Sequence, residues 1–445
     1  MEIKAKKRRG RTSFQIICGS FLSMILVGAL LLMLPISSKE RVVTPFTDCL
    51  FTAVSATCVT GLIVKDTATY WSLFGKCVII TLIQIGGMGV ITIGIAIMQA
   101  TGKKIGFAQR STMQESISAP QVRGIVRLTG FILKTSALIE LTGAVLMAPV
   151  FCRDFGIFKG IGYSLFHSIS AFCNAGFDLM GIRQPFSSLT TYSDNVYINV
   201  IIMLLIITGG IGFLTWHDLL THKLKLRKYT LQSKVVLLTS LILIIIPAVF
   251  FFFFEYGSLD MKERINASLF QSVTTRTAGF NTEDLMQMDA SGKLVMIILM
   301  LIGGSPGSTA GGLKTATVAV LFLAAITVFS RKNDVQCFQR RLPDEAVRNA
   351  GALLFMYLFL STASGIMISK IEGISLLTCL FETASAVGTV GLTLGITTTL
   401  SLASKIILMV LMFFGRVGGL TLIYAAVSSN ENVKVKLPLE KISVG

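Results

Sequence analysis

The sequence predicts an all-α integral membrane protein: four helix–pore-helix–helix units in a pseudo-fourfold arrangement, with eight transmembrane helices. Three observations lead to this prediction, namely the composition, the distribution of basic residues and a short segment that recurs four times. The chain has 445 residues, of which 53% are hydrophobic and 14% charged, with a mean hydropathy of +0.74. A soluble domain carries about 25% charged residues. The apolar residues of this chain also occur in runs long enough to cross a bilayer.

Basic residues gather in five segments that lie between or beside the apolar runs. These segments are residues 4–11, 103–123, 223–228, 331–348 and 434–441. All five lie on one side of the membrane if each intervening unit crosses it twice, and the positive-inside rule places that side in the cytoplasm. We therefore expect both termini to be cytoplasmic, and we read the net charge of +17 as topology and not as a nucleic acid footprint. The first apolar run, Phe14–Leu34, is long enough to be retained as a helix.

Four short segments of the chain match one another. Each starts with Leu-Phe, continues with small residues and ends with a glycine that Leu or Phe follows. The spacing from Leu to Gly is 11, 11, 10 and 11 residues, and the glycines recur at intervals of 115, 103 and 112 residues. An apolar segment too short to span, lying between two spans, is typical of a re-entrant helix. We expect one such helix in each of four units, at residues 1–100, 101–222, 223–335 and 336–445.

A re-entrant helix that ends at the membrane centre presents carbonyl groups with partial negative charge there. Carbonyl rings of this kind can replace the hydration shell of K⁺, and glycine supplies the positive φ that successive inward carbonyls require. We therefore predict a K⁺ filter at Cys58, Val59, Thr60, Gly61, Cys173, Asn174, Ala175, Gly176, Arg276, Thr277, Ala278, Gly279, Gly388, Thr389, Val390 and Gly391. The alternative is that the glycines only allow close helix packing, but four copies in register favour the filter.

The second apolar run of the third unit differs from the others. It covers 38 residues from Lys293 to Ser330, which is too long for one ordinary span. The ten consecutive residues 303–312 contain five glycines and a proline. Such a stretch breaks a helix, and broken helices mark ion paths in transporters. We predict a gate loop formed by Gly303, Gly304, Ser305, Pro306, Gly307, Ser308, Thr309, Ala310, Gly311 and Gly312. A flexible hinge without a gating role is the alternative.

Arg416 is the second predicted gate component. It stands two residues before a Gly-Gly pair, and the corresponding residues before the other pairs are Gln84, Ile207 and Leu301. A charge at membrane depth costs at least about 2.5–3.5 kcal/mol, so Arg416 needs carbonyl or hydroxyl partners. We expect Ser305, Ser308 and Thr309 to supply them. The alternative is a structural charge that helix ends satisfy.

Several other polar residues lie in apolar surroundings. We expect Glu140 and Lys134 to be buried and paired with another helix. His167, Gln271 and Glu382 share one position in the repeat, directly after Leu-Phe, which favours support of the pore helices over ion contact. Asp48 suits the positive end of the first pore helix.

The motifs Thr57–Gly61, Asn174–Phe177, Thr275–Phe280 and Gly388–Thr393 together resemble those of the Ktr/Trk/HKT superfamily of potassium transporters. The chain looks like the KtrB branch over nearly its full length. The resemblance implies K⁺ uptake across the plasma membrane, a gating loop below the filter, and a homodimer in which each protomer has its own pore. It also implies a cytosolic ring of RCK-type regulatory subunits, similar to KtrA or KtrC, which would carry the only nucleotide.

From these features we expect a transporter and not an enzyme, with no covalently bound cofactor. K⁺ is the expected ion, Na⁺ is the expected coupling ion, and membrane lipid is the remaining partner. A rocking secondary transporter with a midplane substrate site is the main alternative, although such proteins usually contain inverted repeats, whereas these four units share one orientation.

Overall fold

The computed structural model describes residues 12–101, 105–117, 121–223 and 225–426. The described chain is helical almost throughout. Its strands are β1 (Gln336–Cys337) and β2 (Arg340–Arg341), which form one antiparallel hairpin. The predicted all-α membrane class is thus confirmed. The basic segments at residues 4–11 and 434–441, and hence both termini, lie outside the described residues.

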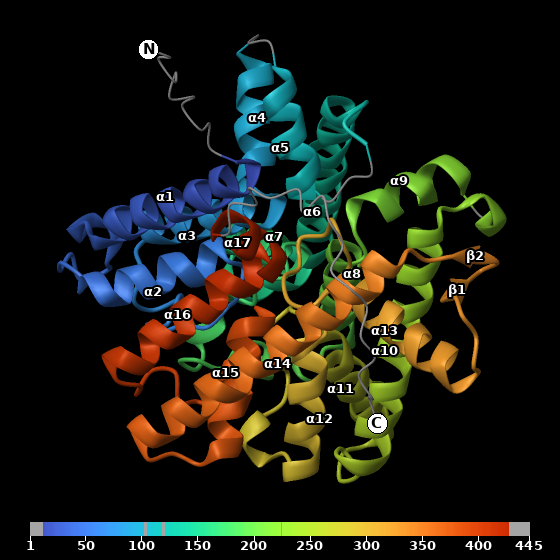
Figure 1. Cartoon of the computed structure of the whole chain (residues 1–445). Coiled ribbons are helices and arrows are strands. Elements are labelled where there is room, and N and C mark those ends of the chain that lie inside the picture. The colour runs from blue at the N-terminus through green and yellow to red at the C-terminus, as the bar shows by residue number, and fades with distance from the viewer. Residues whose placement is uncertain (1–11, 102–104, 118–120, 224, 427–445) are drawn as a thin grey trace.

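Each predicted unit starts with one long apolar helix that packs against a shorter helix. The long helices are α1 (Ser13–Met33), α6 (Ile125–Phe155), α10 (Leu231–Phe254) and α14 (Asp344–Glu372), and each is long and apolar enough to cross a membrane. The short helices are α2 (Phe46–Thr57), α7 (Ile157–Phe172), α11 (Met261–Thr274) and α15 (Leu376–Gly388). They overlap the first parts of the four repeated segments, and Figure 1 shows them arranged around the middle of the molecule.

The second helix is broken in every unit, and not only in the third as the sequence led us to expect. Three pairs bend sharply: α3 (Leu73–Met88) and α4 (Val90–Ala100) by 94°, α8 (Val196–Gly210) and α9 (Phe213–His222) by 99°, and α16 (Leu402–Val417) and α17 (Gly419–Ala426) by 95°. At these breaks Gly89, Gly212 and Gly418 have φ values of 88°, 91° and 92°. These positive values lie outside the range of a right-handed helix and are accessible to glycine. The sixth predicted span, in the third unit, is divided between α12 (Ala290–Leu301) and α13 (Thr315–Phe329), with the predicted gate loop between them.

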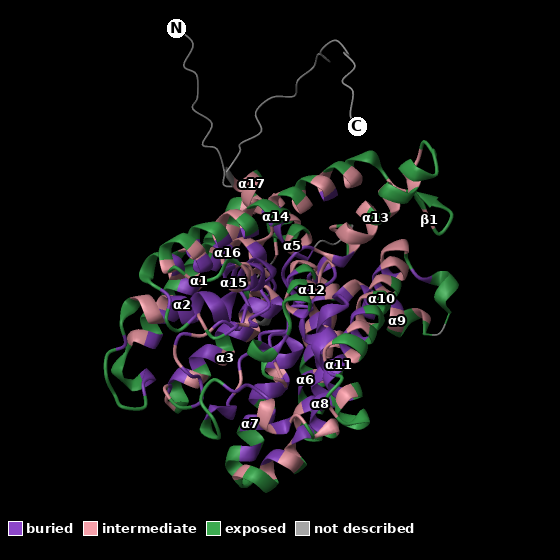
Figure 2. Ribbon diagram, turned by 90° about the horizontal axis from the view of Figure 1, so that it is seen from below, coloured by how far each residue is buried: buried purple, intermediate pink, exposed green. Residues whose placement is uncertain are grey.

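The remaining elements are short connections. They are α5 (Phe107–Ile117) and the 3₁₀ turns η1 (Pro35–Ser37), η2 (Met180–Ile182), η3 (Thr190–Tyr192), η4 (Leu226–Lys228) and η5 (Leu285–Gln287). Buried residues concentrate around the short helices at the centre, and exposed residues lie at the periphery (Figure 2). In the four long helices at most 33% of the most apolar window is buried within the chain. Their outward apolar surface is therefore available to the bilayer.

Candidate functional site: a central ion pathway

A four-residue segment follows each short helix, and its backbone alternates in hand. The second residue of each segment has a positive φ although it is not glycine: 57° at Val59, 59° at Asn174, 68° at Thr277 and 52° at Thr389. The fourth residue is a glycine with φ of 96° at Gly61, 68° at Gly176, 79° at Gly279 and 93° at Gly391. A positive φ outside glycine is uncommon and costs about 1–3 kcal/mol per residue. Four copies of this strained pattern point to function.

The four glycines form a closed ring of close neighbours. A Cβ on Gly61 would lie 2.5 Å from the carbonyl oxygen of Ala175, and one on Gly176 would lie 2.7 Å from that of Ala278. The ring continues, since a Cβ on Gly279 would lie 2.3 Å from the oxygen of Val390, and one on Gly391 2.1 Å from that of Thr60. These contacts leave no room for a side chain. The four segments, which are far apart in the sequence, therefore surround one central point.

A hydroxyl residue five positions after the repeated leucine supports each segment. The hydroxyls of Ser55 and Ser385 accept the amides of Gly61 and Gly391 at 3.1 and 3.0 Å. In the second and third units, Ser170 Oγ donates to the Phe177 carbonyl at 2.7 Å, and Thr274 Oγ1 donates to the Phe280 carbonyl. These hydroxyl residues are not among the predicted site residues. Their constant place in the repeat was the signal that would have identified them.

The last three carbonyl groups of each segment are unpaired among the described residues. All residues of the segments are buried, yet within the described part of the chain no hydrogen bond reaches the last three carbonyl oxygens of any segment. Buried backbone carbonyls are nearly always paired. Twelve unpaired ones around a common centre form a strongly electronegative site that is suited to a dehydrated cation.

The first residue of each segment is less uniform than the others. Arg276 donates from Nη2 to Ser240 Oγ on α10 at 3.0 Å, so its side chain faces the outer helix and not the other three segments. Cys173 Sγ lies 3.5 Å from Gln84 Oε1 on α3.

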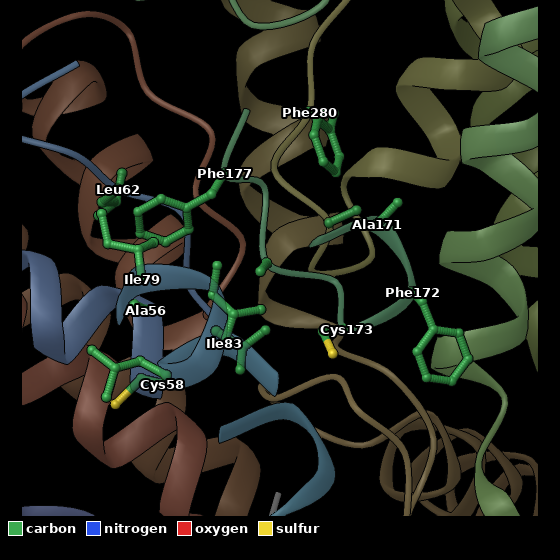
Figure 3. Packing of buried hydrophobic residues seen from close by; sticks show 14 of the residues in the cluster. Ala56, Cys58, Leu62, Ile79, Ile83, Ala171, Phe172, Cys173, Phe177 and Phe280 are labelled. Carbon is green, nitrogen blue, oxygen red and sulfur yellow. The ribbon is translucent and has the colours of Figure 1, made fainter. Parts of the chain in front are cut away.

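Three of the glycines are followed by a large apolar residue. These residues are Leu62, Phe177 and Phe280, and they belong to one buried cluster behind the segments (Figure 3).

Two of the three residues after Leu-Phe, His167 and Glu382, support the pore helices, as expected. His167 Nδ1 lies 2.8 Å from the Tyr163 carbonyl, and its Nε2 accepts the amide of Leu179 at 3.3 Å. Glu382 accepts hydrogen bonds from the hydroxyls of Thr393 and Thr397, which follow the fourth segment. Both side chains thus attach the chain beyond the segment to its own short helix.

The predicted gate loop, residues 303–312, lies directly beneath this ring. The amide of Ser305 donates to the Gly210 carbonyl at 2.9 Å, and Gly307 accepts the amide of Phe213 at 2.7 Å, so the loop is attached to the break in the second unit. Thr309 Oγ1 donates to the carbonyl of Phe172, the last residue of α7, at 3.0 Å. A Cβ on Gly311 would lie 2.2 Å from Thr389 Oγ1 of the fourth segment. The loop therefore contacts the underside of the ring.

Arg416 attaches the loop to the rest of the molecule through carbonyl groups. Nη1 donates to the Thr309 carbonyl, and Nη2 donates to the carbonyls of Gly86 and, at 2.9 Å, Gly87 at the end of α3. Of the three expected partners, Thr309 is confirmed and accepts through its carbonyl, whereas Ser308 Oγ bonds the Ser305 carbonyl instead. Among the described residues no carboxylate lies within 4.0 Å of this guanidinium.

The expected counterparts of Arg416 in the other units are also wrong. Gly86, Gly209 and Gly415 each pack against a carbonyl at the end of their own pore helix, namely Thr57, Phe172 and Val387. The positive-φ glycine stands three residues later in each case. Arg416 therefore corresponds to Gly87 and Gly210, not to Gln84 and Ile207. Contact with the pore-helix end, and not membership of a Gly-Gly pair, defines the equivalent position in these three units.

Cavities lie on both sides of the ring. On the loop side, a cavity of about 140 Å³ is lined by residues that include Lys314, Arg416 and Glu115 of α5. On the opposite side, a cavity of about 260 Å³ is lined by all four ring glycines and by Asp178 and Asp284. Burial, with Asp66 nearby, raises the pKa of Asp178 to about 7. The ring with the loop beneath it thus separates two polar spaces.

Glu140 is buried and paired with another helix, as predicted, but Lys134 is not. The Glu140 carboxylate accepts from Gln84 Nε2 of α3 at 3.0 and 3.1 Å. Lys134 is exposed on the outer face of α6, because six residues on a helix place the two side chains on different faces. Asp48 lies in the first turn of α2, as expected, within 3.7 Å of Lys65 and 3.8 Å of Lys405.

Re-entrant helices that converge on a strained backbone ring, within a shell of membrane-spanning helices, define a membrane ion transporter. The chain belongs to the TrkH family, described as cation transport proteins, whose sequence model matches residues 2–435. It is therefore a transport protein and not an enzyme.

Named relatives agree with this family. The chain is 39% identical to the potassium/sodium uptake protein NtpJ of Enterococcus hirae, with 100% of both chains covered. It is 36% identical to the Ktr system potassium uptake protein B of Bacillus subtilis, with 97% of this chain and 96% of the relative covered. The crystal structure of the potassium transporter TrkH from Vibrio parahaemolyticus shares the fold, with a TM-score of 0.74 at 19% identity over 96% of this chain and 87% of the other.

Proposed function

We propose that the chain takes up K⁺ through the central ring, which acts as a selectivity filter. The filter comprises residues 58–61, 173–176, 276–279 and 388–391, contributed by four units that correspond to residues 1–100, 101–222, 223–335 and 336–445 in a pseudo-fourfold arrangement. The unpaired, buried carbonyls around one centre carry this proposal. A K⁺ ion that sheds its hydration shell finds replacement oxygens there, with the pore-helix ends adding negative partial charge.

The loop at residues 303–312 and Arg416 form the gate in this proposal. The loop occupies the space below the filter, where its hydrogen bonds to the second unit hold it. The Arg416 guanidinium adds a fixed positive charge, which opposes a cation on the same path. Opening then requires the loop to move and these hydrogen bonds to break.

The relatives favour K⁺ as the ion and a system with further components. One relative is named a potassium/sodium uptake protein, which supports Na⁺ as the coupling ion. Others are named as parts of a Ktr system, which supports a separate regulatory component. We propose a homodimer in the plasma membrane whose basic loops, with both termini, face the cytoplasm and meet an RCK-type nucleotide-binding ring there.

The proposal is tested by K⁺ uptake in cells that lack their own K⁺ uptake systems. Cells expressing the chain are expected to grow at low external K⁺ and to take up K⁺ faster when external Na⁺ is present. The control is the Gly391→Ser variant at equal membrane abundance, which is expected to fail at low K⁺. Equal uptake by empty cells and expressing cells, with and without a regulatory partner, would contradict K⁺ uptake. Equal uptake with and without Na⁺ would contradict only the coupling.

A further inference from the structure

A groove on the outer surface between α3 and α7 combines an apolar wall with two lysines. Its volume is about 520 Å³, and its walls include Ile80, Phe158 and Phe166, with Lys76 and Lys159. Leu179 also lines it, next to Asp178 of the cavity above the filter. The groove thus lies at the starts of α3 and α7, at the level where the filter opens away from the gate loop.

The surroundings of this groove are those of a surface that faces lipid. Leu73 at the start of α3 is 80% exposed, and Phe158 at the start of α7 is 94% exposed. Large apolar side chains so exposed are stable only where hydrocarbon covers them. At the centre of the groove Gly162 leaves open space, since no atom lies within 4 Å of the position its Cβ would occupy. An acyl chain has room to lie there.

The end of the groove is positively charged, since no described carboxylate lies within 4.0 Å of either lysine, although Asp66 acts on Lys76 at longer range. Lys159 is exposed in the first turn of α7, a helix of 16 residues that has neither an acidic residue in that turn nor a side-chain cap. Its free amides carry partial positive charge and attract anions. Lys76 uses one N–H on the Ala68 carbonyl at 2.7 Å and retains two others. The positive charge of a lysine in the first turn lies next to the positive end of the helix dipole and destabilises the helix. An anion bound beside the lysine compensates both positive charges.

We propose that this groove binds one anionic glycerophospholipid. The phosphate lies between Lys76 and Lys159 near the first amides of α7, and an acyl chain runs past Gly162 along Ile80 and Phe166. The site requires the membrane location and not the proposed ion selectivity. The groove is linked to the second pore helix, because Leu179 in its wall donates its amide to His167 Nε2 on α7, the helix that precedes the segment at residues 173–176. A bound lipid therefore stabilises the packing of α7 against α3.

The test uses the delipidated full-length protein in detergent, with its thermal unfolding midpoint followed during lipid titration. Phosphatidylglycerol, phosphatidylcholine with the same acyl chains, and inorganic phosphate are the three probes. We expect phosphatidylglycerol to raise the midpoint at a lower concentration than phosphatidylcholine, by about fivefold for each lysine engaged. Inorganic phosphate is expected to have no effect, because it lacks the acyl chain.

Two variants and one control locate the site. Lys159→Gln is expected to weaken the phosphatidylglycerol response about fivefold and to leave the phosphatidylcholine response unchanged. Gly162→Leu fills the groove and is expected to abolish both responses. Gly130→Leu, on α6 outside the groove and with equally open space, is expected to behave as wild type. The proposal is overturned if the two lipids act equally on the wild type, if Lys159→Gln changes nothing, or if both leucine variants respond alike.

Discussion

The guanidinium of Arg416 donates a hydrogen bond to the carbonyl of Thr309, 107 residues earlier in the chain. The same side chain reaches the carbonyls of Gly86 and Gly87 at the end of α3. One side chain of the fourth unit thus holds the loop of the third unit against the first. Its charge has only carbonyl partners among the described residues, so no carboxylate neutralises it beneath the ring of glycines.

Replacing Arg416 by Gln is expected to raise the basal K⁺ flux. The variant loses both the loop contact and the charge. For an assumed separation of about 8 Å and an effective dielectric constant of about 20, a unit charge opposes K⁺ by about 2 kcal/mol, so loss of the charge alone corresponds to about thirtyfold in flux. Uptake is measured at matched membrane abundance without the regulatory partner. The exposed Arg348→Gln serves as the control. An equal or slower rate in folded Arg416→Gln would leave Arg416 as a structural residue.

Deleting residues 305–309 is expected to raise the flux and reduce its dependence on the partner. The deletion removes the bonds from Ser305 to Gly210 and from Thr309 to Gly209 and Phe172, together with the atoms that fill the path. Thr309→Val, which loses only the hydroxyl bond to Phe172, is expected to act in the same direction with a smaller effect. Flux of the reconstituted protein is measured with and without the partner. A deletion variant that stays slow and partner-dependent contradicts a gate.

The positive-φ backbone of the four segments was predictable from sequence because it is local and repeated. The positive φ values at residues 61, 176, 279 and 391 favour glycine, so the conformation can be recognised from the repeated glycines in the sequence. The hydroxyls at Ser55, Ser170, Thr274 and Ser385 were equally visible but needed the fold to show what they bind. Repetition identifies a position but not its partner.

The breaks in the second helices and the partners of Arg416 were not predictable in this way. A helix breaks at Gly89, Gly212 and Gly418 because the chain must turn beneath the pore-helix ends. That constraint comes from tertiary packing. Glycines within an apolar helix also occur in straight membrane helices, so the sequence pattern alone does not predict a break. The Gln84 partner of Glu140 lies 56 residues away, and sequence periodicity carries no information about which helices face each other.

Uptake is expected to lose K⁺ affinity as the external pH falls through about 7. Burial, with Asp66 nearby, raises the pKa of Asp178 to about 7, and Asp178 lines the cavity above the filter. Above that pH its carboxylate is charged and attracts cations, whereas below it the neutral acid does not. Apparent KM for K⁺ is measured from pH 5.5 to 8.5 (about three units around this pKa). Asp178→Asn is expected to remove the step, and the exposed Asp194→Asn to retain it. A step that persists in Asp178→Asn excludes this group.

Replacing Gln84 by Leu is expected to destabilise the protein. The variant leaves the buried Glu140 carboxylate without its amide donor, and a lost hydrogen bond to a charged group costs about 1.5–3 kcal/mol. The double variant Gln84→Leu, Glu140→Leu removes both polar groups and is expected to recover part of the loss. Thermal unfolding in one detergent compares the variants, and Lys134→Leu on the exposed face of α6 is the control. Additive losses in the double variant would show that the two side chains are not coupled.

Adding a side chain at the filter glycines is expected to weaken K⁺ selection. In Gly391→Ser the new Cβ meets the Thr60 carbonyl oxygen at 2.1 Å, and in Gly279→Ser it meets that of Val390 at 2.3 Å. Each carbonyl must move, and the positive φ adds strain of about 1–2 kcal/mol. Together these effects correspond to about a tenfold or larger loss of K⁺ affinity, or to entry of Na⁺. Gly373→Ser is the matched control, because Gly373 has a φ of 69° and no atom within 4 Å of its Cβ position. Apparent KM for K⁺ and the K⁺/Na⁺ uptake ratio are measured for all three variants.

If Gly373→Ser loses as much selectivity as the other two variants, general backbone strain and not the position in the ring explains the effect. Unchanged affinity and selectivity in Gly391→Ser and Gly279→Ser would remove these glycines from the ion path.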